Sequence, residues 1–301
     1  MRDQGRVIRK PARFPESPSP RPEFTLMPKS IKDKIVLITG ASSGFGADAA
    51  RLFAREGCIV LLAARRVDRL TAIAQEIQSA GGQAFAIPLD IAEPSQVDEV
   101  VRTVLDNFGH IDILVNNAGY GRLDWLENLH PARDIENQIA VNLTGLIRAT
   151  RTVLPSMLER RSGVIINMCS MAGWIAAPLY SIYSATKFGV RGFTEALRRE
   201  VSPFGIQVCG IYPGGATTEF GLHTGNHPTK KLFKKISFIN MSSEYVARRI
   251  VGLAKRPRRT LILPWWYRLV LLFALNFPGL VDWILKVGFV QQSHRFEKKE
   301  Q

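Results

Sequence analysis

Tyr183 and Lys187 stand four residues apart, with Ser170 and Asn142 earlier in the chain. On a helix, positions i and i+4 share a face, so the ammonium can lie beside the phenol. A free phenol has a pKa near ~10, and lowering it by about 3 units corresponds to about 4 kcal/mol of differential stabilisation. The four side chains supply a proton donor, a cation, a hydroxyl and an amide, which suits acid–base chemistry on an alcohol or a carbonyl. A Tyr–Lys pair alone is more often a solvated helix face, so this prediction depends on its context.

A glycine-rich turn follows the first apolar strand. Residues 34–39 read as a short buried strand, the turn Gly-Ala-Ser-Ser-Gly-Phe-Gly spans 40–46, and an apolar helical pattern follows. This order places backbone N–H groups and a helix N-terminus against a pyrophosphate. The spacing is Gly-x-x-x-Gly-x-Gly rather than Gly-x-Gly-x-x-Gly, but its position between a strand and a helix predicts a dinucleotide site. The residues predicted to hold this ligand are Thr39, Gly40, Ser42, Ser43, Gly44, Phe45 and Gly46.

Further motifs accompany these two in a consistent order. The chain carries Thr39-Gly40-x-x-x-Gly44-x-Gly46, Asn116-Asn117-Ala118-Gly119, Asn142, Ser170, Tyr183-x-x-x-Lys187 and Pro213-Gly214. Over roughly residues 32–260, this set resembles the short-chain dehydrogenase/reductase (SDR) family in order and spacing. The resemblance implies hydride transfer between a nicotinamide and a carbonyl or secondary alcohol.

The resemblance also implies a role for each matched residue. Tyr183 exchanges a proton with the substrate oxygen, Ser170 hydrogen-bonds that oxygen, and Lys187 lowers the tyrosine pKa and binds the nicotinamide ribose. Asn142 supports a water chain that relays the proton to solvent. The other implied cofactor contacts are Asp90 and Ile91 beside the adenine, Asn116, Ala118 and Gly119 at the adenosine ribose, and Pro213, Gly214 and Thr218 at the carboxamide. Ala216 departs mildly from the family, which often has a branched aliphatic residue there.

The end of the second predicted strand bears on the choice of cofactor. A site that prefers NAD usually has Asp or Glu there, on the ribose 2′-hydroxyl. Here the strand ends in Ala63-Ala64-Arg65-Arg66, without an acid. Arg65 or Arg66 could instead bind a 2′-phosphate through a charge-assisted bidentate contact, although Arg66 could also be only a surface residue at a helix start. NADP(H) is therefore favoured over NAD(H).

Apolar strands alternate with helices along the chain. Strands are predicted at 34–39, 58–63, 84–89, 111–115, 164–168, 206–211 and 261–263. Helices are predicted at 68–80, after Glu93-Pro94, at 132–158 and at 181–201. Continuous apolar strands separated by helices predict a Rossmann-like α/β fold with a doubly wound parallel sheet covered on both faces. The motifs all fall at the carboxyl ends of the strands, where such sheets bind their ligands.

Length and composition predict a single domain, because 301 residues with 46% hydrophobic content can bury a large core. We expect this domain at 31–263, after an Arg- and Pro-rich extension at 1–30 that resembles a disordered segment and has no secretory signal. Met27 is an alternative start. Three cysteines without metal-type spacing indicate reduced thiols in a cytoplasmic protein, and no metal site is expected.

The last segment, 264–301, is apolar with a basic end. Paired tryptophans lead into an apolar run at 269–275, and a Phe-Pro-Gly break precedes a second run at 280–290. The uninterrupted run is well short of the ~20 residues needed to span a membrane. Two alternatives stay open. These helices lie peripherally in an anionic membrane surface, or they form a flap over the pocket or against another subunit.

Substrate identity is less constrained. Trp174 and Phe220 belong to apolar segments expected on the substrate side, which predicts a hydrophobic carbonyl or alcohol, with a 3-oxoacyl thioester as the runner-up. The net charge of +14 favours acidic surfaces and phosphate-bearing ligands, but no nucleic-acid recognition module is visible. A non-catalytic NADP-binding sensor or scaffold on the same fold would be expected to have lost at least one catalytic residue. Dimers or tetramers are common in the family, with the long helices at 132–158 and 181–201 as the expected interface.

Overall fold

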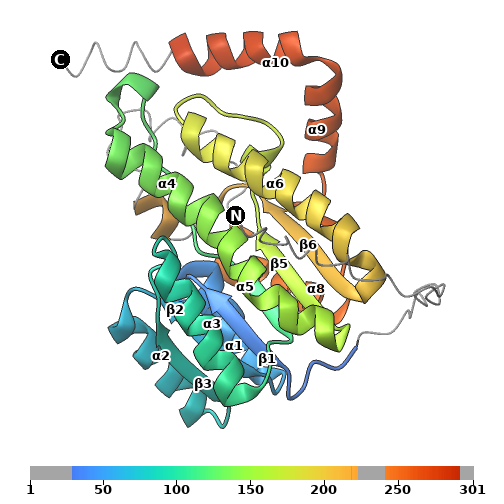
Figure 1. Ribbon diagram of the computed structural model, residues 1–301. Coiled ribbons are helices and arrows are strands. Elements are labelled where there is room, and N and C mark those ends of the chain that lie inside the picture. The colour runs from blue at the N-terminus through green and yellow to red at the C-terminus, as the bar shows by residue number, and fades with distance from the viewer. Residues whose placement is uncertain (1–28, 218, 223–240, 292–301) are drawn as a thin grey trace, which may run out of the picture.

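Seven parallel strands form the central sheet, in the order β3-β2-β1-β4-β5-β6-β9 (Figure 1). The computed structural model describes residues 29–217, 219–222 and 241–291. The strands are β1 Ile35–Thr39, β2 Ile59–Ala64, β3 Gln83–Pro88, β4 Ile113–Asn116, β5 Gly163–Met168, β6 Ile206–Pro213 and β9 Thr260–Leu263. This confirms the predicted doubly wound parallel sheet.

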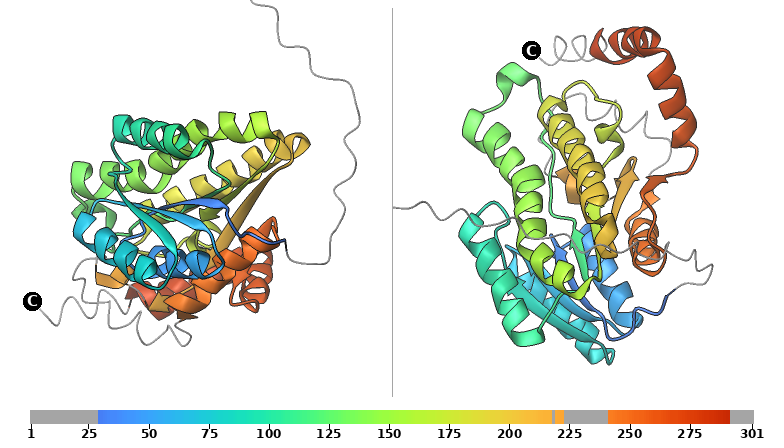
Figure 2. Two further views of the ribbon diagram at one scale, coloured as in Figure 1. Left: turned by 90° about the horizontal axis from the view of Figure 1, so that it is seen from below. Right: turned by 45° about the vertical axis from the view of Figure 1, so that its right-hand side comes forward.

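Helices cover both faces of the sheet, as the left view of Figure 2 shows. One face carries α1 Gly44–Arg55, α2 Val67–Ser79 and α8 Ser243–Lys255, and the other carries α3 Pro94–Phe108, α5 Gly145–Arg160 and α6 Ser181–Val201. All five residues of β1 are buried, because each of its faces meets a helical layer. Burying one such Ile or Leu side chain stabilises the fold by ~1.5–3 kcal/mol.

The chain reverses its winding direction between β1 and β4. The first three strands step outward from β1 to β3, and the chain then returns to place β4 on the other side of β1. In doubly wound sheets this reversal opens a crevice at the carboxyl ends of the two strands. The glycine-rich turn follows β1 and the Asn116–Gly119 segment follows β4, so both lie at this crevice.

Two helical segments differ from the prediction. The helix expected at 132–158 runs from Pro131 to Arg160, but it passes through π-helical turns at Pro131–Glu136 and Ala140–Thr144, on either side of α4 Asn137–Ile139. Helix α8 was not predicted. Its signal is nevertheless in the sequence, because Val246, Ala247 and Ile250 recur at helical spacing on its buried face.

The C-terminal helices leave the sheet at the end of β9. Helix α9 Tyr267–Asn276 and helix α10 Pro278–Leu285 lie at the top of the molecule, and a π-helical turn follows at Lys286–Val290 (Figure 1; Figure 2, right). Within the described residues, no single helix is long and apolar enough to cross a membrane. The pair formed by 267–276 and 278–290, bent by 107°, meets the length and composition criteria only when taken together.

Candidate active site

Tyr183, Lys187 and Ser170 are brought together where β5 meets α6. Lys187 is 3% exposed, and its Nζ lies 5.6 Å from the centroid of the Tyr183 ring. The same Nζ donates a hydrogen bond of 2.9 Å to the carbonyl of Met168, the last residue of β5. The Ser170 Oγ accepts from the Ala172 N–H at 3.1 Å, and Ser170 lies near enough to the Tyr183 phenol to influence its pKa.

Burial dominates the electrostatics of this group. It raises the pKa of Tyr183 above its ordinary value, while the nearby Ser170 hydroxyl opposes that rise. Burial also lowers the pKa of Lys187 to about 8. The expected lowering of the Tyr183 pKa by Lys187 is therefore not seen in the protein without cofactor. The free-energy cost of burying a phenolate exceeds the stabilisation that the surrounding groups give it. At neutral pH Tyr183 keeps its proton, which is the state of a general acid.

Asn142 lies in the second π-helical turn and is fully buried. Its Oδ1 accepts from the Tyr120 N–H at 2.9 Å, and its Nδ2 donates to the Tyr120 carbonyl at 2.7 Å and to the Thr186 Oγ1 at 3.2 Å. A Cβ on Gly119 would lie 3.1 Å from the Asn142 Oδ1 and 3.5 Å from the Lys187 Nζ, so the glycine allows the loop after β4 to approach both groups. Asn142 thus ties this loop to α6, and its part in a water relay stays a prediction.

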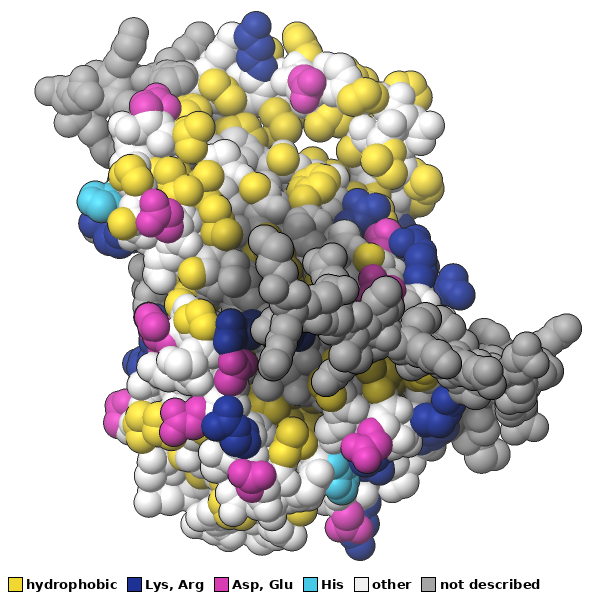
Figure 3. Space-filling view, in the orientation of Figure 1, with side chains coloured by type: hydrophobic (Ala, Val, Ile, Leu, Met, Phe, Trp, Pro, Cys, Tyr) yellow, Lys and Arg dark blue, Asp and Glu magenta, His cyan; other side chains and the backbone are white. Residues whose placement is uncertain are grey.

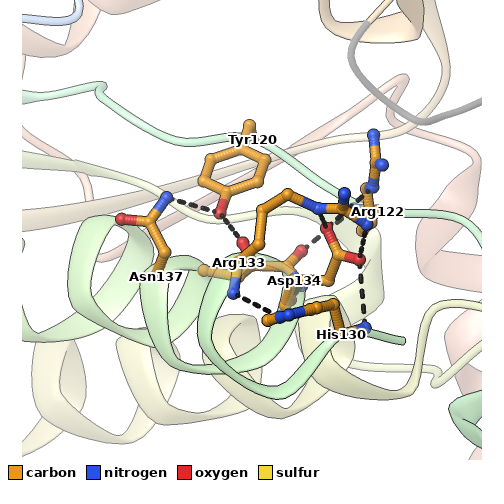
Figure 4. Close-up of polar contacts among 7 residues, drawn as sticks. Tyr120, Arg122, His130, Arg133, Asp134 and Asn137 are labelled. Atoms are coloured by element: carbon orange, nitrogen blue, oxygen red, sulfur yellow. Dashed lines mark hydrogen bonds and ion pairs between the residues drawn. The ribbon is translucent and has the colours of Figure 1, made fainter.

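A polar network holds the segment that follows Tyr120 (Figure 4). The Tyr120 hydroxyl donates to the Arg133 carbonyl at 3.3 Å and accepts from the Asn137 Nδ2 at 2.9 Å. The buried Asp134 carboxylate pairs with Arg133 at 2.7 Å and with Arg122 at 3.0 Å. The hydrogen bond from Arg133 is the largest cause that lowers the pKa of Asp134 to about 2. No sequence motif marks this network, although it anchors the loop whose backbone holds the Asn142 amide.

The glycine-rich turn is shaped by close backbone approach. Gly40 has φ 66°, and a Cβ there would lie 2.7 Å from the Ala118 Cα. A Cβ on Gly46 would lie 2.5 Å from the Gly40 carbonyl oxygen. Helix α1 begins at Gly44 with no side-chain cap and no acidic residue in its first turn, so its N–H groups are suited to an anion.

Some predicted cofactor residues turn out to have structural side chains. The Thr39 Oγ1 accepts from the N–H groups of Asn117 and Ala118, at 3.0 and 3.1 Å. The Asn116 side chain is buried and donates to Thr150 and Asn167, at 2.8 and 2.9 Å. These side chains join β1 to β4 and β4 to its neighbours, so a cofactor contact at Thr39 or Asn116 would be made through the backbone, and that contact stays a prediction.

Two neighbours of these residues add to the same picture. Asn117, the second residue of the motif at 116–119, donates from its amide to the carbonyls of Thr39 and Gly40 at 3.0 and 3.1 Å and so fixes the turn. Phe45 is partly buried and packs against the core cluster under α1, so a cofactor contact at Phe45 would also be made through the backbone.

Arg66 rather than Arg65 faces the glycine-rich turn. Its guanidinium donates to the Ser42 Oγ at 3.0 and 3.1 Å and to the Ser43 Oγ at 2.7 Å. The Arg65 side chain is 66% exposed and lies 3.7 Å from Asp90. The cation and hydroxyls around Arg66 thus gather at the end of β2, where a 2′-phosphate would be bound. Ile91, next to Asp90, is buried.

On the opposite side of the crevice lie the Pro213–Gly214 turn at the end of β6 and Phe220, whose ring packs against that of Tyr183. The Gly214 N–H donates to the Leu263 carbonyl at 2.8 Å, and a Cβ on Gly214 would collide with the Tyr267 ring. The rings of Phe220 and Tyr183 lie 5.4 Å apart between centroids. Pro213 ends β6, and the predicted contact at Thr218 lies outside the described residues.

Trp174, expected on the substrate side, is packed between two neighbours. Its ring lies 5.6 Å from the Tyr212 ring, and the Arg191 guanidinium carbon lies 3.3 Å from its centroid. These contacts place Trp174 in the apolar cluster that also includes Tyr267 and Leu271. A direct contact with substrate stays a prediction.

Comparison with known proteins agrees with this arrangement. A family model described as short chain dehydrogenase matches residues 34–227. The chain belongs to the short-chain dehydrogenase family. It is therefore an oxidoreductase that acts on CH–OH or C=O groups with NAD(P).

Among the relatives of this short-chain dehydrogenase, a fatty acyl-CoA reductase of Acinetobacter baylyi is 31% identical over 266 residues, covering 88% of this chain and 87% of that protein. A 3-oxoacyl-[acyl-carrier-protein] reductase of Synechocystis is 38% identical over 191 residues, covering 63% of this chain and 77% of that protein. The structure is similar to that of a Sphingobium yanoikuyae short-chain dehydrogenase in complex with NADPH, with a TM-score of 0.71 and 30% identity over 83% of this chain and 95% of the other.

The residues of this short-chain dehydrogenase fit a nicotinamide dinucleotide. The turn after β1 has no room for side chains at Gly40 and Gly46, so its backbone can approach a pyrophosphate. At one end of the crevice lie Arg66 and its two serine partners, and at the other end lie Lys187 and the Pro213–Gly214 turn.

Proposed function

We propose that this dehydrogenase is an NADP-dependent reductase of hydrophobic carbonyl compounds, with Tyr183 as its general acid. The observation that carries this proposal is the buried Lys187, whose Nζ lies 5.6 Å from the centroid of the Tyr183 ring, with Ser170 near enough to the phenol to lower its pKa. Burial keeps the pKa of Tyr183 above its ordinary value, which favours proton donation over proton removal at neutral pH.

The bound nicotinamide would supply the hydride to the carbonyl carbon. Ser170 hydrogen-bonds the substrate oxygen, and its orientation is set by the Ala172 N–H. Tyr183 gives its phenol proton to the same oxygen as negative charge develops there. Lys187, held by the Met168 carbonyl, keeps a positive charge near the resulting tyrosinate.

The preference for NADP rests on Arg66. The Ser42 and Ser43 hydroxyls and the Glu219 carboxylate hold the Arg66 guanidinium at the end of β2, and β2 itself does not end in an acid that would select the 2′-hydroxyl of NAD. A planar guanidinium binds phosphate oxygens in a bidentate manner. The NADPH complex of the similar Sphingobium enzyme supports this preference.

The proposal of a hydrophobic substrate rests on Phe220, whose aromatic ring lies next to that of Tyr183. The Phe220 ring lies edge-on to the Tyr183 ring. A substrate bound at Tyr183 would therefore contact an apolar ring, which favours an apolar group on the substrate at that point. The acyl substrates named for two relatives also favour an apolar chain beside the reacting carbonyl. The 3-oxoacyl reductase supports a second candidate, a 3-oxoacyl thioester.

The test is oxidation of NADPH and NADH by the purified protein with hydrophobic ketones, hydrophobic aldehydes and 3-oxoacyl thioesters. We expect turnover with NADPH that Tyr183→Phe lowers by at least ~10³-fold, since it removes the proton donor. Tyr180→Phe is the matched control, because Tyr180 packs on Tyr183 but is not followed by a lysine four residues on. Equal activity of Tyr183→Phe and wild type would contradict the assignment. Tight NADPH binding without turnover of any substrate would favour the alternative, a non-catalytic NADP-binding sensor or scaffold.

We also propose that the enzyme forms a homo-oligomer through the long helices. Ile139 on α4 and Phe188 on α6 are large apolar side chains that stay exposed on these helices. Analytical ultracentrifugation of the wild type and of an Ile139→Lys/Phe188→Lys variant tests this, and a monomeric wild type would contradict it.

A further inference from the structure

Large apolar side chains are exposed along the C-terminal helices. Figure 3 shows hydrophobic side chains gathered over the upper part of the molecule, where Figure 1 places α9 and α10. We call residues 265–290 the tail segment. Its exposed large hydrophobic residues are Trp265, Leu269, Val270, Leu272, Phe273, Leu275, Phe277, Leu280, Trp283, Ile284 and Val287. A contiguous apolar surface of this kind marks a site of interaction with a protein or a membrane.

The tail segment is held in place at both ends. Near its start, Leu271 is 5% exposed and packs in the cluster that contains Tyr212 and Ile262. Near its end, Phe289 is 4% exposed and packs with Leu123 and Leu179. These two contacts fix the segment to the domain, so its exposed face has a defined position.

The distribution of apolar residues around α9 favours lipid over a protein partner. Successive residues of a helix are ~100° apart, so exposed positions 269, 270, 272, 273 and 275 cover more than half of its circumference. A second copy of the chain would cover one stripe of a helix, whereas hydrocarbon surrounds every exposed side. The observed pattern therefore matches immersion in a lipid layer.

The dimensions of the two helices limit how deep they can reach. At ~1.5 Å per residue, α9 is about 15 Å long and the helical stretch 278–290 that begins with α10 is about 20 Å long, so each is shorter than the ~30 Å hydrocarbon core. Because the pair is bent by 107°, it cannot act as one straight span. This geometry suits insertion into a single leaflet.

The polar residues of the tail segment suit the surface of an anionic leaflet. Exposed Arg268 and Lys286 outnumber the one acid, Asp282, and the whole chain carries a net charge of +14. Trp265 and Trp283 are 72% and 60% exposed. Tryptophan concentrates at the level of lipid headgroups, and basic residues near the surface are attracted to anionic lipids.

We propose that the tail segment is a monotopic membrane anchor that inserts into one leaflet of an anionic bilayer. It leaves the domain at Tyr267, beside the Gly214 turn of the cofactor crevice, and returns at Phe289, beside Leu179. Tyr180 follows Leu179 and packs on Tyr183, with 5.6 Å between ring centroids. Both ends of the anchor thus adjoin segments that lead to the site of Tyr183. If the proposed reductase function holds, a carbonyl compound dissolved in the bilayer reaches Tyr183 from the lipid side.

Flotation of the full chain with vesicles tests the anchor without reference to activity. One set of vesicles is phosphatidylcholine alone, and the other is phosphatidylcholine mixed with phosphatidylglycerol. We expect the wild type to float with both, and more strongly with the anionic set at low salt. A Leu272→Gln/Phe273→Gln/Leu275→Gln variant should bind at least tenfold more weakly. Its matched control is Val67→Gln/Phe85→Gln/Tyr245→Gln, which changes exposed apolar side chains on α2, β3 and α8 and should bind like the wild type.

A second measurement reports insertion itself. Phosphatidylcholine brominated on its acyl chains should quench tryptophan fluorescence of the wild type, and Trp283→Phe should remove part of that quenching. The proposal is overturned if the folded wild type floats with neither vesicle, or if the tail variant floats like the wild type. It is also overturned if the tail variant dissociates a dimer of the wild type while no lipid binding is found. Turnover of a water-soluble ketone without vesicles separates these outcomes from a failure of the proposed reductase function.

Discussion

Glu219 and Arg66 form an ion pair across the cofactor crevice, with 3.0 Å between the carboxylate Oε2 and the guanidinium Nη1. Glu219 also receives hydrogen bonds of 2.6 and 2.9 Å from Arg69. The two arginines, Arg69 first, lower the pKa of Glu219 to about 2, so the carboxylate is charged at every physiological pH. The Glu219 carboxylate thus occupies Nη1 of Arg66, the arginine to which we assign binding of the 2′-phosphate.

The first prediction is that Glu219→Gln tightens NADPH binding. The wild-type carboxylate competes with the phosphate for Arg66, whereas an amide does not carry the competing charge. Arg66 stays in place because Ser42 and Ser43 also hold it. We expect the Kd for NADPH to fall by about three- to tenfold, or about 1 kcal/mol, with little change for NADH. Isothermal titration calorimetry measures both.

The matched control for this change is Glu76→Gln. Glu76 pairs with Arg51 at 2.8 Å on the surface of α1 and α2, away from the crevice. The Glu76→Gln substitution removes the same charge at a site away from the cofactor, so the Kd of this variant for NADPH should stay at the wild-type value. If Glu219→Gln weakened NADPH and NADH equally, Glu219 would be a structural support rather than a competitor.

The second prediction separates the two arginines that the sequence left open. Arg66→Gln should weaken NADPH binding by at least ~10-fold and NADH binding much less, because it removes a charge-assisted contact to the phosphate. Arg65→Gln should change both affinities little, since Arg65 is largely exposed and 3.7 Å from Asp90. A larger effect for Arg65→Gln would reverse the assignment.

The fold and the placement of Tyr183 beside Lys187 could be predicted because their signals are local. Uninterrupted apolar strands specify a sheet buried on both faces, and Tyr183 with Lys187 share one helix face through spacing alone. The same holds for Gly40 and Gly46, whose lack of a side chain is itself the signal.

Other parts of the site depend on contacts between distant segments. Asn116 is directed inward by Thr150 and Asn167, which come from α5 and β5. The ion pair of Arg66 with Glu219 joins residues 153 positions apart. No local pattern encodes such pairings. The pKa of Tyr183 likewise depends on how deeply the fold buries its ring, which the spacing to Lys187 does not reveal.

The third prediction concerns the network beneath the loop of Tyr120. Asp134→Asn should lower the free energy of unfolding by about 2 kcal/mol at pH 7, because a buried carboxylate with two arginine partners loses its charge. It should also lower kcat, since this network anchors the loop that holds Asn142. Urea denaturation and steady-state kinetics measure the two effects.

The pH dependence of this effect follows from the pKa of Asp134. The folded value of about 2 lies below the reference value of 3.8, so the stabilisation is complete above pH 3.8 and is lost as the pH falls toward 2. The difference between wild type and Asp134→Asn should therefore shrink in acid. Asp98→Asn is the control, because Asp98 pairs with Arg148 at the surface and should matter much less. Equal losses for the two variants would contradict a special role for Asp134.

The fourth prediction is that kcat/KM for NADPH declines above pH 8. Lys187 has its pKa lowered to about 8 by burial, so its ammonium loses its proton above that pH, and kcat/KM reports groups of the free enzyme. Loss of protein stability through the titration of Lys187 does not explain the decline in kcat/KM. The pKa of Lys187 in the folded protein lies below the reference value of 10.5, so between pH 8 and 10.5 the unfolded chain binds more protons than the folded one. The contribution of Lys187 to stability therefore rises with pH over that range. Melting temperatures in the same buffers, with Lys187→Met as an inactive variant that lacks the buried charge, check this sign. A flat activity profile through pH 8 would mean that the charge of Lys187 does not limit turnover.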